Sequence, residues 1–186
     1  MTQGERRTSD VELFDATYDG IHSPPSADGP RRLYNGLGQL VDGEEGQSNF
    51  RLDPKSLGVK GYEWIGWRND SFAGAAAAAG SGGACVEISF KFDAVRNFSA
   101  LRIVANNMFS KDVRVFRSAR VAFSVGGVVY SSPPVVYDYM RDSLIEYFRP
   151  VVVPLLHGIG RYVRVQLFFD SRWMMISEVQ FESGES

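Results

Sequence analysis

The stretch VEISFKF, Val86 to Phe92, decides the fold class because its apolar and polar side chains alternate strictly. A period of two places the apolar side chains on one face of a β-strand and the polar ones on the other. The same alternation recurs further along the chain, at Leu101 and Ile103, at Val113 and Val115, at Val121, Phe123 and Val125, and at Val163, Val165, Leu167 and Phe169. We expect many short strands, separated by turn clusters such as SVGGVVYSSPP and LLHGIGR, with little helix. The pattern predicts an all-β protein, an antiparallel sandwich or barrel.

The composition is that of one soluble globular domain. The chain has 186 residues and a formal net charge of -2, which gives no field for nucleic acid or acidic lipid. No run approaches the roughly 20 apolar residues of a membrane span, and the N-terminus lacks the apolar core of a signal peptide. We expect residues 1–12 to be a flexible tail and residues 13–183 to form the domain. The low-complexity Ala/Gly segment at 73–84 is expected to be a loop.

The residues that catalysis requires are scarce in this sequence. Its single cysteine, Cys85, excludes an internal disulfide, and we expect it to be a small buried hydrophobe. A zinc site is not expected from one cysteine with only His22 and His157 beside it. Neither histidine lies near a nucleophile motif, and no phosphate-binding or metalloprotease motif is present. The sequence therefore predicts a protein that is not an enzyme.

Two kinds of candidate site remain. The loop YNGLGQLVDGEEG, Tyr34 to Gly46, combines glycines with Gln, Asp and Glu, so it suits either a loop around a hard cation or an ordinary tight turn. Two triplets, Asn69-Asp-Ser and Asn97-Phe-Ser, are N-glycan acceptors if the chain enters the secretory pathway. The aromatic residues suggest a sugar-binding platform, but most fall on the apolar phase of strands and are expected in the core.

Five motifs in order give the chain a family resemblance. They are TYDG (17–20), GLGQLVDG (36–43), GYEWIGWRNDSF (61–72), NNMFS (106–110) and WMMISEVQF (173–181). Together they resemble the discoidin-like domain of the discoidin domain receptors, collagen-activated receptor tyrosine kinases, over roughly Leu13 to Phe181. The resemblance implies a jelly-roll β-sandwich of the discoidin, or coagulation factor type C, kind. Vertebrate members carry several cysteines in this domain and this chain does not, which suggests an invertebrate member.

The resemblance also implies a bound calcium ion and its ligands. The family's ligands map onto the side chains of Gln39 and Asp42, the backbone carbonyl of Glu44 and the pair Ser177-Glu178. Phe14, by its backbone, and Tyr62 and Trp64 are further candidates to complete the shell. Calcium takes six to eight oxygen ligands at about 2.3–2.6 Å, so a Gly-rich loop closed by a Glu from a distant strand is a suitable cage.

Two functional hypotheses follow from these observations. The first is a calcium-stabilised extracellular module of a single-pass plasma-membrane receptor. In it, the domain packs on an adjacent discoidin domain of the same receptor, reaches collagen indirectly through that domain, and modulates activation within a receptor homodimer. The second is a carbohydrate- or lipid-binding jelly-roll module attached to an enzyme. Exposed Trp and Tyr at the tips of the sandwich would favour the second hypothesis.

Overall fold

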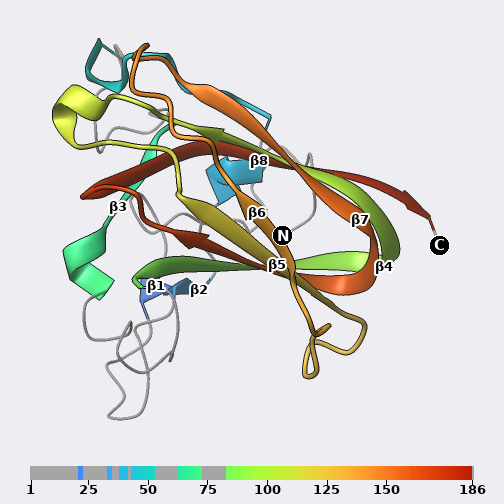
Figure 1. Ribbon diagram of the computed structural model, residues 1–186. Helices are drawn as coiled ribbons and strands as arrows, with labels where there is room; N and C mark the ends of the chain where they lie inside the picture. Colours follow the sequence, from blue (N-terminus) through green and yellow to red (C-terminus); the bar gives the residue numbers. More distant parts are fainter. Residues whose placement is uncertain are drawn as a thin grey trace.

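The computed structural model describes residues 21–22, 33–34, 38–41, 43–52, 63–72 and 83–185, and its long regular elements are all strands (Figure 1). The strands are β1 (Ile21–His22), β2 (Leu33–Tyr34), β3 (Ile65–Arg68), β4 (Cys85–Ala105), β5 (Ser118–Ser124), β6 (Val135–Asp138), β7 (Arg149–Phe168) and β8 (Trp173–Glu185). The helices are 3₁₀ turns: η1 (Gly38–Val41), η2 (Phe50–Leu52), η3 (Asn69–Phe72) and η4 (Phe109–Lys111). No helix in these ranges is long and apolar enough to cross a membrane. The expectation of an all-β chain with little helix is confirmed.

Six strands form one antiparallel sheet in the order β3-β8-β4-β7-β5-β6, and β1 pairs with β2 separately. β4 and β7 are long, and their pairing shifts register between Lys91 and Arg96. On one side of this shift β7 pairs with β5, and on the other side β4 pairs with β8. The long strands therefore belong to two layers and bend from one into the other, as the green and orange ribbons at the right of Figure 1 show.

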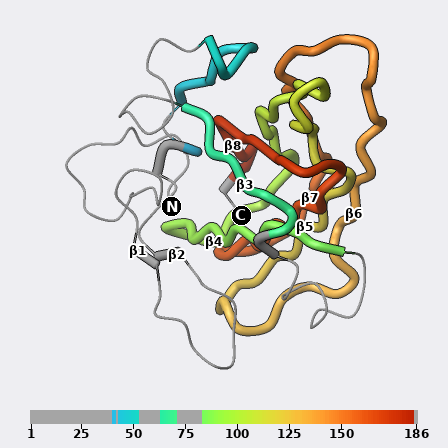
Figure 2. The backbone as a smooth tube through the Cα atoms, turned by 90° about the vertical axis from the view of Figure 1, so that its left-hand side faces the viewer, coloured from blue at the N-terminus to red at the C-terminus, as the bar shows by residue number. Residues whose placement is uncertain are grey.

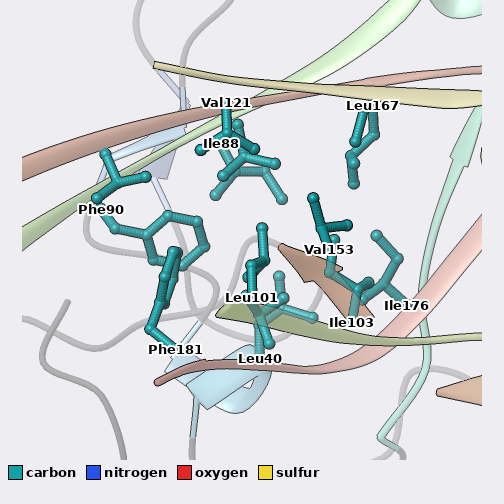
Figure 3. Close-up of a cluster of buried hydrophobic side chains, with 14 of the residues drawn as sticks. Leu40, Ile88, Phe90, Leu101, Ile103, Val121, Val153, Leu167, Ile176 and Phe181 are labelled. Atoms are coloured by element: carbon teal, nitrogen blue, oxygen red, sulfur yellow. The ribbon is translucent and has the colours of Figure 1, made fainter. Parts of the chain in front are cut away.

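The two layers pack face to face through an aromatic core. Phe90 from one layer lies edge-on to Phe181 from the other, with ring centroids 4.9 Å apart. Phe98 stacks on Phe123 across the same interface at 5.8 Å. Figure 3 shows these layers meeting around Ile88, Leu101, Val121 and Val153, among others. Burial of these side chains, at about 1.5–3 kcal/mol each, makes the bent sheet a sandwich.

The alternation in VEISFKF is confirmed. Val86, Ile88, Phe90 and Phe92 are buried, and Glu87, Ser89 and Lys91 are exposed. A second, smaller apolar cluster lies on the outer face of the other layer and contains Trp64, Val104, Met108, Val113 and Met175. The tube in Figure 2, viewed from the side of β3, shows β3 next to β8, with which it pairs at the edge of this layer.

Three expectations about the strands are wrong. LLHGIGR is no turn between strands: it lies inside β7, where Leu156 and His157 take positive φ angles of 54° and 59° and let the strand bend. Val113 and Val115 are buried, but only Val113 takes part in pairing, through a single parallel bridge to Trp173. Val125 is 59% exposed because β5 ends at Ser124.

Other expectations fall partly or wholly outside the described ranges. Residues 1–12 lie outside them, as do residues 73–82 of the Ala/Gly segment. Cys85 begins β4 and is half-buried, and burial raises the pKa of its thiol. It therefore stays a neutral thiol, in keeping with a structural rather than a reactive residue.

Candidate functional site

A β-bulge in β8 carries two buried polar residues, Ser177 and Glu178. Ala105 of β4 pairs with Ile176 and the preceding Val104 pairs with Glu178, so Ser177 is the extra residue on β8. A bulge reverses which face the following residues present. Met174 and Ile176 face the main core before it, and Val179 and Phe181 face that core after it. Glu178 is thereby kept off the aromatic core and placed on the outer face of the sheet.

The loop from Gly43 to Ser48 covers this outer face. The Gly43 amide donates a hydrogen bond to Glu178 Oε2 at 3.3 Å. Further along the loop, Glu45 Oε1 accepts one at 2.6 Å from Nη1 of Arg102, a β4 residue on the same face. The preceding turn, η1, packs on β8. As a result Ser177 and Glu178 are buried, with 0% and 1% of their surfaces exposed.

Tight packing fixes the far end of the loop. The Trp64 indole is fully buried, and its Nε1 donates to the Gln47 carbonyl at 3.0 Å. Gly46 lies so close to this ring that a Cβ there would be 2.3 Å from Nε1. Asn106 Nδ2 donates to the Ser48 carbonyl at 3.1 Å. The loop is thus held at Glu178, Arg102, Trp64 and Asn106 in turn.

Buried oxygen atoms gather around this bulge and loop. Within the described ranges the Ser177 hydroxyl is buried and has no hydrogen-bond partner. The Asn106 Oδ1 atom is likewise buried and also has no hydrogen-bond partner there. Leaving such a group unsatisfied costs about 1–3 kcal/mol, so each calls for a partner. The carboxylate of the next residue, Glu178, is also buried and accepts the hydrogen bond from the Gly43 amide. A hard cation bound here would satisfy the Ser177 hydroxyl, and a carboxylate is among the oxygen ligands that such a cation takes.

The structure brings some of the predicted ligands together. Ser177 and Glu178 occupy the bulge, the Glu44 backbone follows the amide that contacts Glu178, and Gln39 lies on η1, which packs on β8. The side chain of Glu44 is exposed, in keeping with a ligand role for its carbonyl only. Asp42, Phe14 and Tyr62 lie outside the described residues. The indole of Trp64 packs in the apolar cluster, so it would support the site rather than coordinate a metal by its side chain.

The donor set fits calcium better than a transition metal. Across the described segments no three His, Cys, Asp or Glu side chains are grouped so that they could hold a metal ion by themselves. The donors available here are a hydroxyl, backbone carbonyls and a carboxylate, which are the hard oxygen ligands that Ca²⁺ prefers.

Sequence reasoning missed three residues that shape this region. Position 46 needs a glycine because the Trp64 ring leaves no room for a Cβ atom. Asn106 holds the loop through its hydrogen bond to the Ser48 carbonyl. Glu63, which precedes Trp64, has a buried Oε2 atom. One signal in the sequence could have located the bulge. The apolar phase of WMMISEVQF changes from even positions, Met174 and Ile176, to odd ones, Val179 and Phe181.

The remaining candidates are placed as follows. Asn69 is half-buried and its Nδ2 donates to the Ser171 carbonyl at 3.2 Å. Asn97 lies on β4, paired with Ile159 and Gly184, and is also half-buried. Its Oδ1 lies 3.2 Å from Nδ1 of the exposed His157, so this histidine contacts an amide rather than a carboxylate. His22 belongs to the short strand β1.

The tryptophans bear on the hypothesis of a sugar-binding module. Trp64 is buried, and Trp67 and Trp173 are partly buried and pack against the two apolar clusters. None of the three forms an exposed aromatic platform.

These features define an all-β sandwich whose outer face carries a docked, oxygen-rich loop. The sequence model of the family "Discoidin domain-containing receptor 1/2, DS-like domain" matches residues 1–183, and the chain belongs to this family. The resemblance drawn from the five motifs is confirmed, as is the jelly-roll fold class. The match is to the DS-like domain and not to a kinase domain, so the chain is a non-catalytic module.

Curated relatives support the same family. The "Discoidin domain-containing receptor tyrosine kinase B" of Caenorhabditis elegans is 32% identical over 190 residues, covering 100% of this chain and 21% of the relative. The "Epithelial discoidin domain-containing receptor 1" of Rattus norvegicus is 33% identical over 174 residues, covering 93% of this chain and 18% of the relative. The chain therefore spans about a fifth of the length of these receptors.

A solved structure is more distant. The C-terminal domain of a chitobiase from Bacteroides fragilis aligns with 91% of this chain and 95% of its own, with a TM-score of 0.49 and 11% identity. Such a likeness does not bear on function.

Proposed function

We propose that this chain is an extracellular module of a collagen-activated receptor tyrosine kinase, on the outer side of the plasma membrane. It packs on the adjacent collagen-binding discoidin domain, reaches collagen indirectly through that domain, and modulates activation of a receptor homodimer. The observation that carries this proposal is the family match over residues 1–183. The relatives named as receptors are about five times longer than the chain, which leaves room in them for the other domains.

Calcium is the proposed stabilising ion of the module. The Ser177 hydroxyl and the Glu178 carboxylate would hold it from β8, and Gln39, Asp42 and the Glu44 carbonyl would hold it from the loop. When bound, it would supply a divalent positive charge that cross-links the loop to the last strand. The buried Ser177 hydroxyl, which lacks a hydrogen-bond partner in the described part of the chain, supports this assignment.

Thermal unfolding of the chain with excess calcium and with chelator tests the ion. Calcium at a hundred times its dissociation constant adds about 2.7 kcal/mol. For a domain of this size that is a rise in midpoint of roughly 5–10 °C. Asp42→Ala and Ser177→Ala should abolish most of the rise. The control Asp70→Ala, which removes an exposed carboxylate paired with Arg68, should leave it intact. Equal midpoints with calcium and with chelator in the wild type would remove calcium from the proposal.

A domain exchange tests the receptor role. This chain would replace the DS-like domain of the Caenorhabditis elegans receptor tyrosine kinase B, and collagen-stimulated tyrosine phosphorylation would be measured on cells. The chimera should reach the surface and respond to collagen, because the two domains share 32% identity over the whole chain. A chimera that carries Gly46→Ala should respond less than the parent chimera at equal surface level. Equal responses from the two chimeras would contradict a modulating role for the module.

A further inference from the structure

Two apolar side chains are exposed at the bend of β7. Leu156 is 75% exposed and Ile159 is 55% exposed. Gly158, between them, faces the inner side of the strand, because a Cβ there would be 2.2 Å from the ring of Phe123, a core residue. Ile159, the next residue, therefore points to the outer side. We call Leu156 and Ile159 the apolar pair.

The glycan acceptor Asn97 is a direct neighbour of this pair. It lies opposite Ile159 in the pairing of β4 with β7. The next residue, Phe98, is fully buried in the core, so the Asn97 side chain faces outward, on the same side of the sheet as Ile159. Paired residues on one face have Cβ atoms about 4.5–5.5 Å apart. A sugar attached to Asn97 would therefore start beside an exposed isoleucine.

A hydrogen bond and an open space orient the acceptor. An amide oxygen only accepts, so Nδ1 of the exposed His157 donates to Asn97 Oδ1, at 3.2 Å. This bond does not involve Nδ2, the atom that carries an N-glycan. On the other side of Asn97, β8 places Gly184, where an added Cβ would meet nothing within 4 Å. A sugar on Nδ2 thus has the side chains of β7 on one side and open space on the other.

We propose that Asn97 carries an N-glycan and that its first N-acetylglucosamine packs on the apolar pair. The transfer forms a bond between Asn97 Nδ2 and C1 of the sugar, breaks the bond from C1 to the phosphate oxygen of a lipid-diphosphate donor, and releases the lipid diphosphate and one proton of Nδ2. It precedes the folding of β4, because Asn97 is paired on both sides in the folded chain. This assignment rests on the proposed extracellular function, since only a chain in the secretory pathway meets the donor.

Contact with the sugar would remove apolar area from water on both partners. The C–H groups of the sugar ring and its acetamido methyl group are apolar, and they would cover side chains that are otherwise exposed. The glycan is held within reach by its covalent bond, so the contact does not carry the entropy cost of capturing a free ligand. Covalent attachment therefore makes even a small contact area effective.

The small size of the apolar pair favours a sugar over a protein or a membrane. Two side chains offer far less than the area of about 800 Å² per partner that a standard protein interface buries. A bilayer would also have to take up His157 and Asn97, whose polar groups lie in the same surface. A single sugar ring fits an area of this size while its hydroxyl groups stay in water.

A glycan here would keep one face of the module in solvent. Asn97 lies at the bend of β4 and β7, next to the C-terminal end of β8, at the right of Figure 1. A branched sugar at this end would exclude protein surfaces from the bend. The adjacent domain of the receptor would then pack on another part of the module.

The test compares two forms of the same polypeptide, the whole chain with Ser71→Ala, which removes the other sequon and keeps Asn69. One form is made in bacteria without glycan. The other is made in cells that add high-mannose glycans and is trimmed with endoglycosidase H to one N-acetylglucosamine. The trimmed form should be heavier by this one sugar and should unfold about 2–4 °C higher. A chain without sugar at Asn97, or equal Tm values for the two forms, would overturn the proposal.

Variants of β7 locate the contact. With Leu156→Ser and Ile159→Ser together, the rise in Tm should fall below about 1 °C, because the sugar would have no apolar surface to cover. The matched control Val152→Ser changes another exposed side chain of β7, one that lies opposite Arg102 and not Asn97, and should keep the full rise. A rise that persists in the double variant, or that is lost in the control, would refute the contact.

Further measurements separate the other occupants. An NMR nuclear Overhauser effect should join the acetamido methyl group to the Ile159 side chain, and its absence would overturn the proposal. So would a dimer of the trimmed chain, or binding to phosphatidylcholine vesicles, that the double variant abolishes. A wild-type chain glycosylated at Asn69 but not at Asn97 would refute this proposal and leave the extracellular role standing. A chimera that does not respond to collagen would instead remove the receptor role and leave the rise in Tm in place.

Discussion

Replacing Gly46 with alanine should loosen the loop that covers the bulge in β8. The added methyl group would lie 2.3 Å from Nε1, 2.4 Å from Cε2 and 2.9 Å from Cδ1 of Trp64. Neither side can yield easily, because the indole is fully buried among Val104, Met108 and Met175. The loop, held elsewhere by Glu178 and Arg102, is the part that must move.

The cost of this substitution has two parts. Overpacking a filled site costs about 1–3 kcal/mol. Moving the loop away also breaks the 3.0 Å hydrogen bond from Trp64 Nε1 to the Gln47 carbonyl, which contributes about 1 kcal/mol. The sum is about 2–4 kcal/mol. For a domain of this size it corresponds to a fall in Tm of roughly 5–15 °C.

Urea unfolding followed by tryptophan fluorescence measures this cost. Gly184→Ala is the matched control, because it adds the same methyl group where nothing lies within 4 Å, and it should change the free energy of unfolding by less than about 0.5 kcal/mol. If Gly46→Ala is as stable as this control, the loop does not lie against Trp64, and the site described around the bulge does not exist in that form.

Three further predictions concern other parts of the chain. Gly158→Ala should lower the urea midpoint, at a cost of about 1–3 kcal/mol, because its Cβ would lie 2.2 Å from Phe123; an unchanged midpoint would refute the close packing at the β7 bend. The pKa of Asp142 is lowered to about 2, first by its hydrogen bond to Arg149. A lowered folded-state pKa stabilises above the unfolded value of about 3.9, so stability should fall from about pH 4 to pH 2, and Asp142→Asn should flatten this part of the stability curve measured by urea unfolding. In glycosylating cells Asn97→Gln should lower the intact mass by one glycan, because the Asn97 side chain is half-exposed and its contact with His157 uses Oδ1 rather than Nδ2; an unchanged mass would contradict this.

Strict alternation made much of the core predictable from the sequence. Where a strand has one buried face, as in VEISFKF, the period of two assigns each side chain to its face. The bend in β7 was not predictable in this way. Gly158 and Gly160 look like turn residues, yet here they let the strand pass close to Phe123 and Ser124. A bend within a strand and a turn between strands use the same residue types.

The candidate site was predictable in its residues but not in its geometry. Ser177 and Glu178 could be named from a resemblance, but their burial depends on a bulge and on a loop more than 130 residues away in the chain. The residues next to Gly46 in the sequence do not show why a glycine is needed there, because the steric conflict is with the Trp64 ring, which is distant in the sequence.

Isothermal titration of calcium into the chelator-stripped chain tests whether the bulge of β8 and the covering loop hold an ion. The wild type should show one binding site per chain, and Ser177→Ala, which removes the buried hydroxyl but little volume, should bind at least about tenfold more weakly. A wild-type titration with no binding heat and no shift in Tm, or a Ser177→Ala variant that binds calcium as tightly as the wild type, would contradict the claim that the bulge of β8 and the covering loop hold a calcium ion.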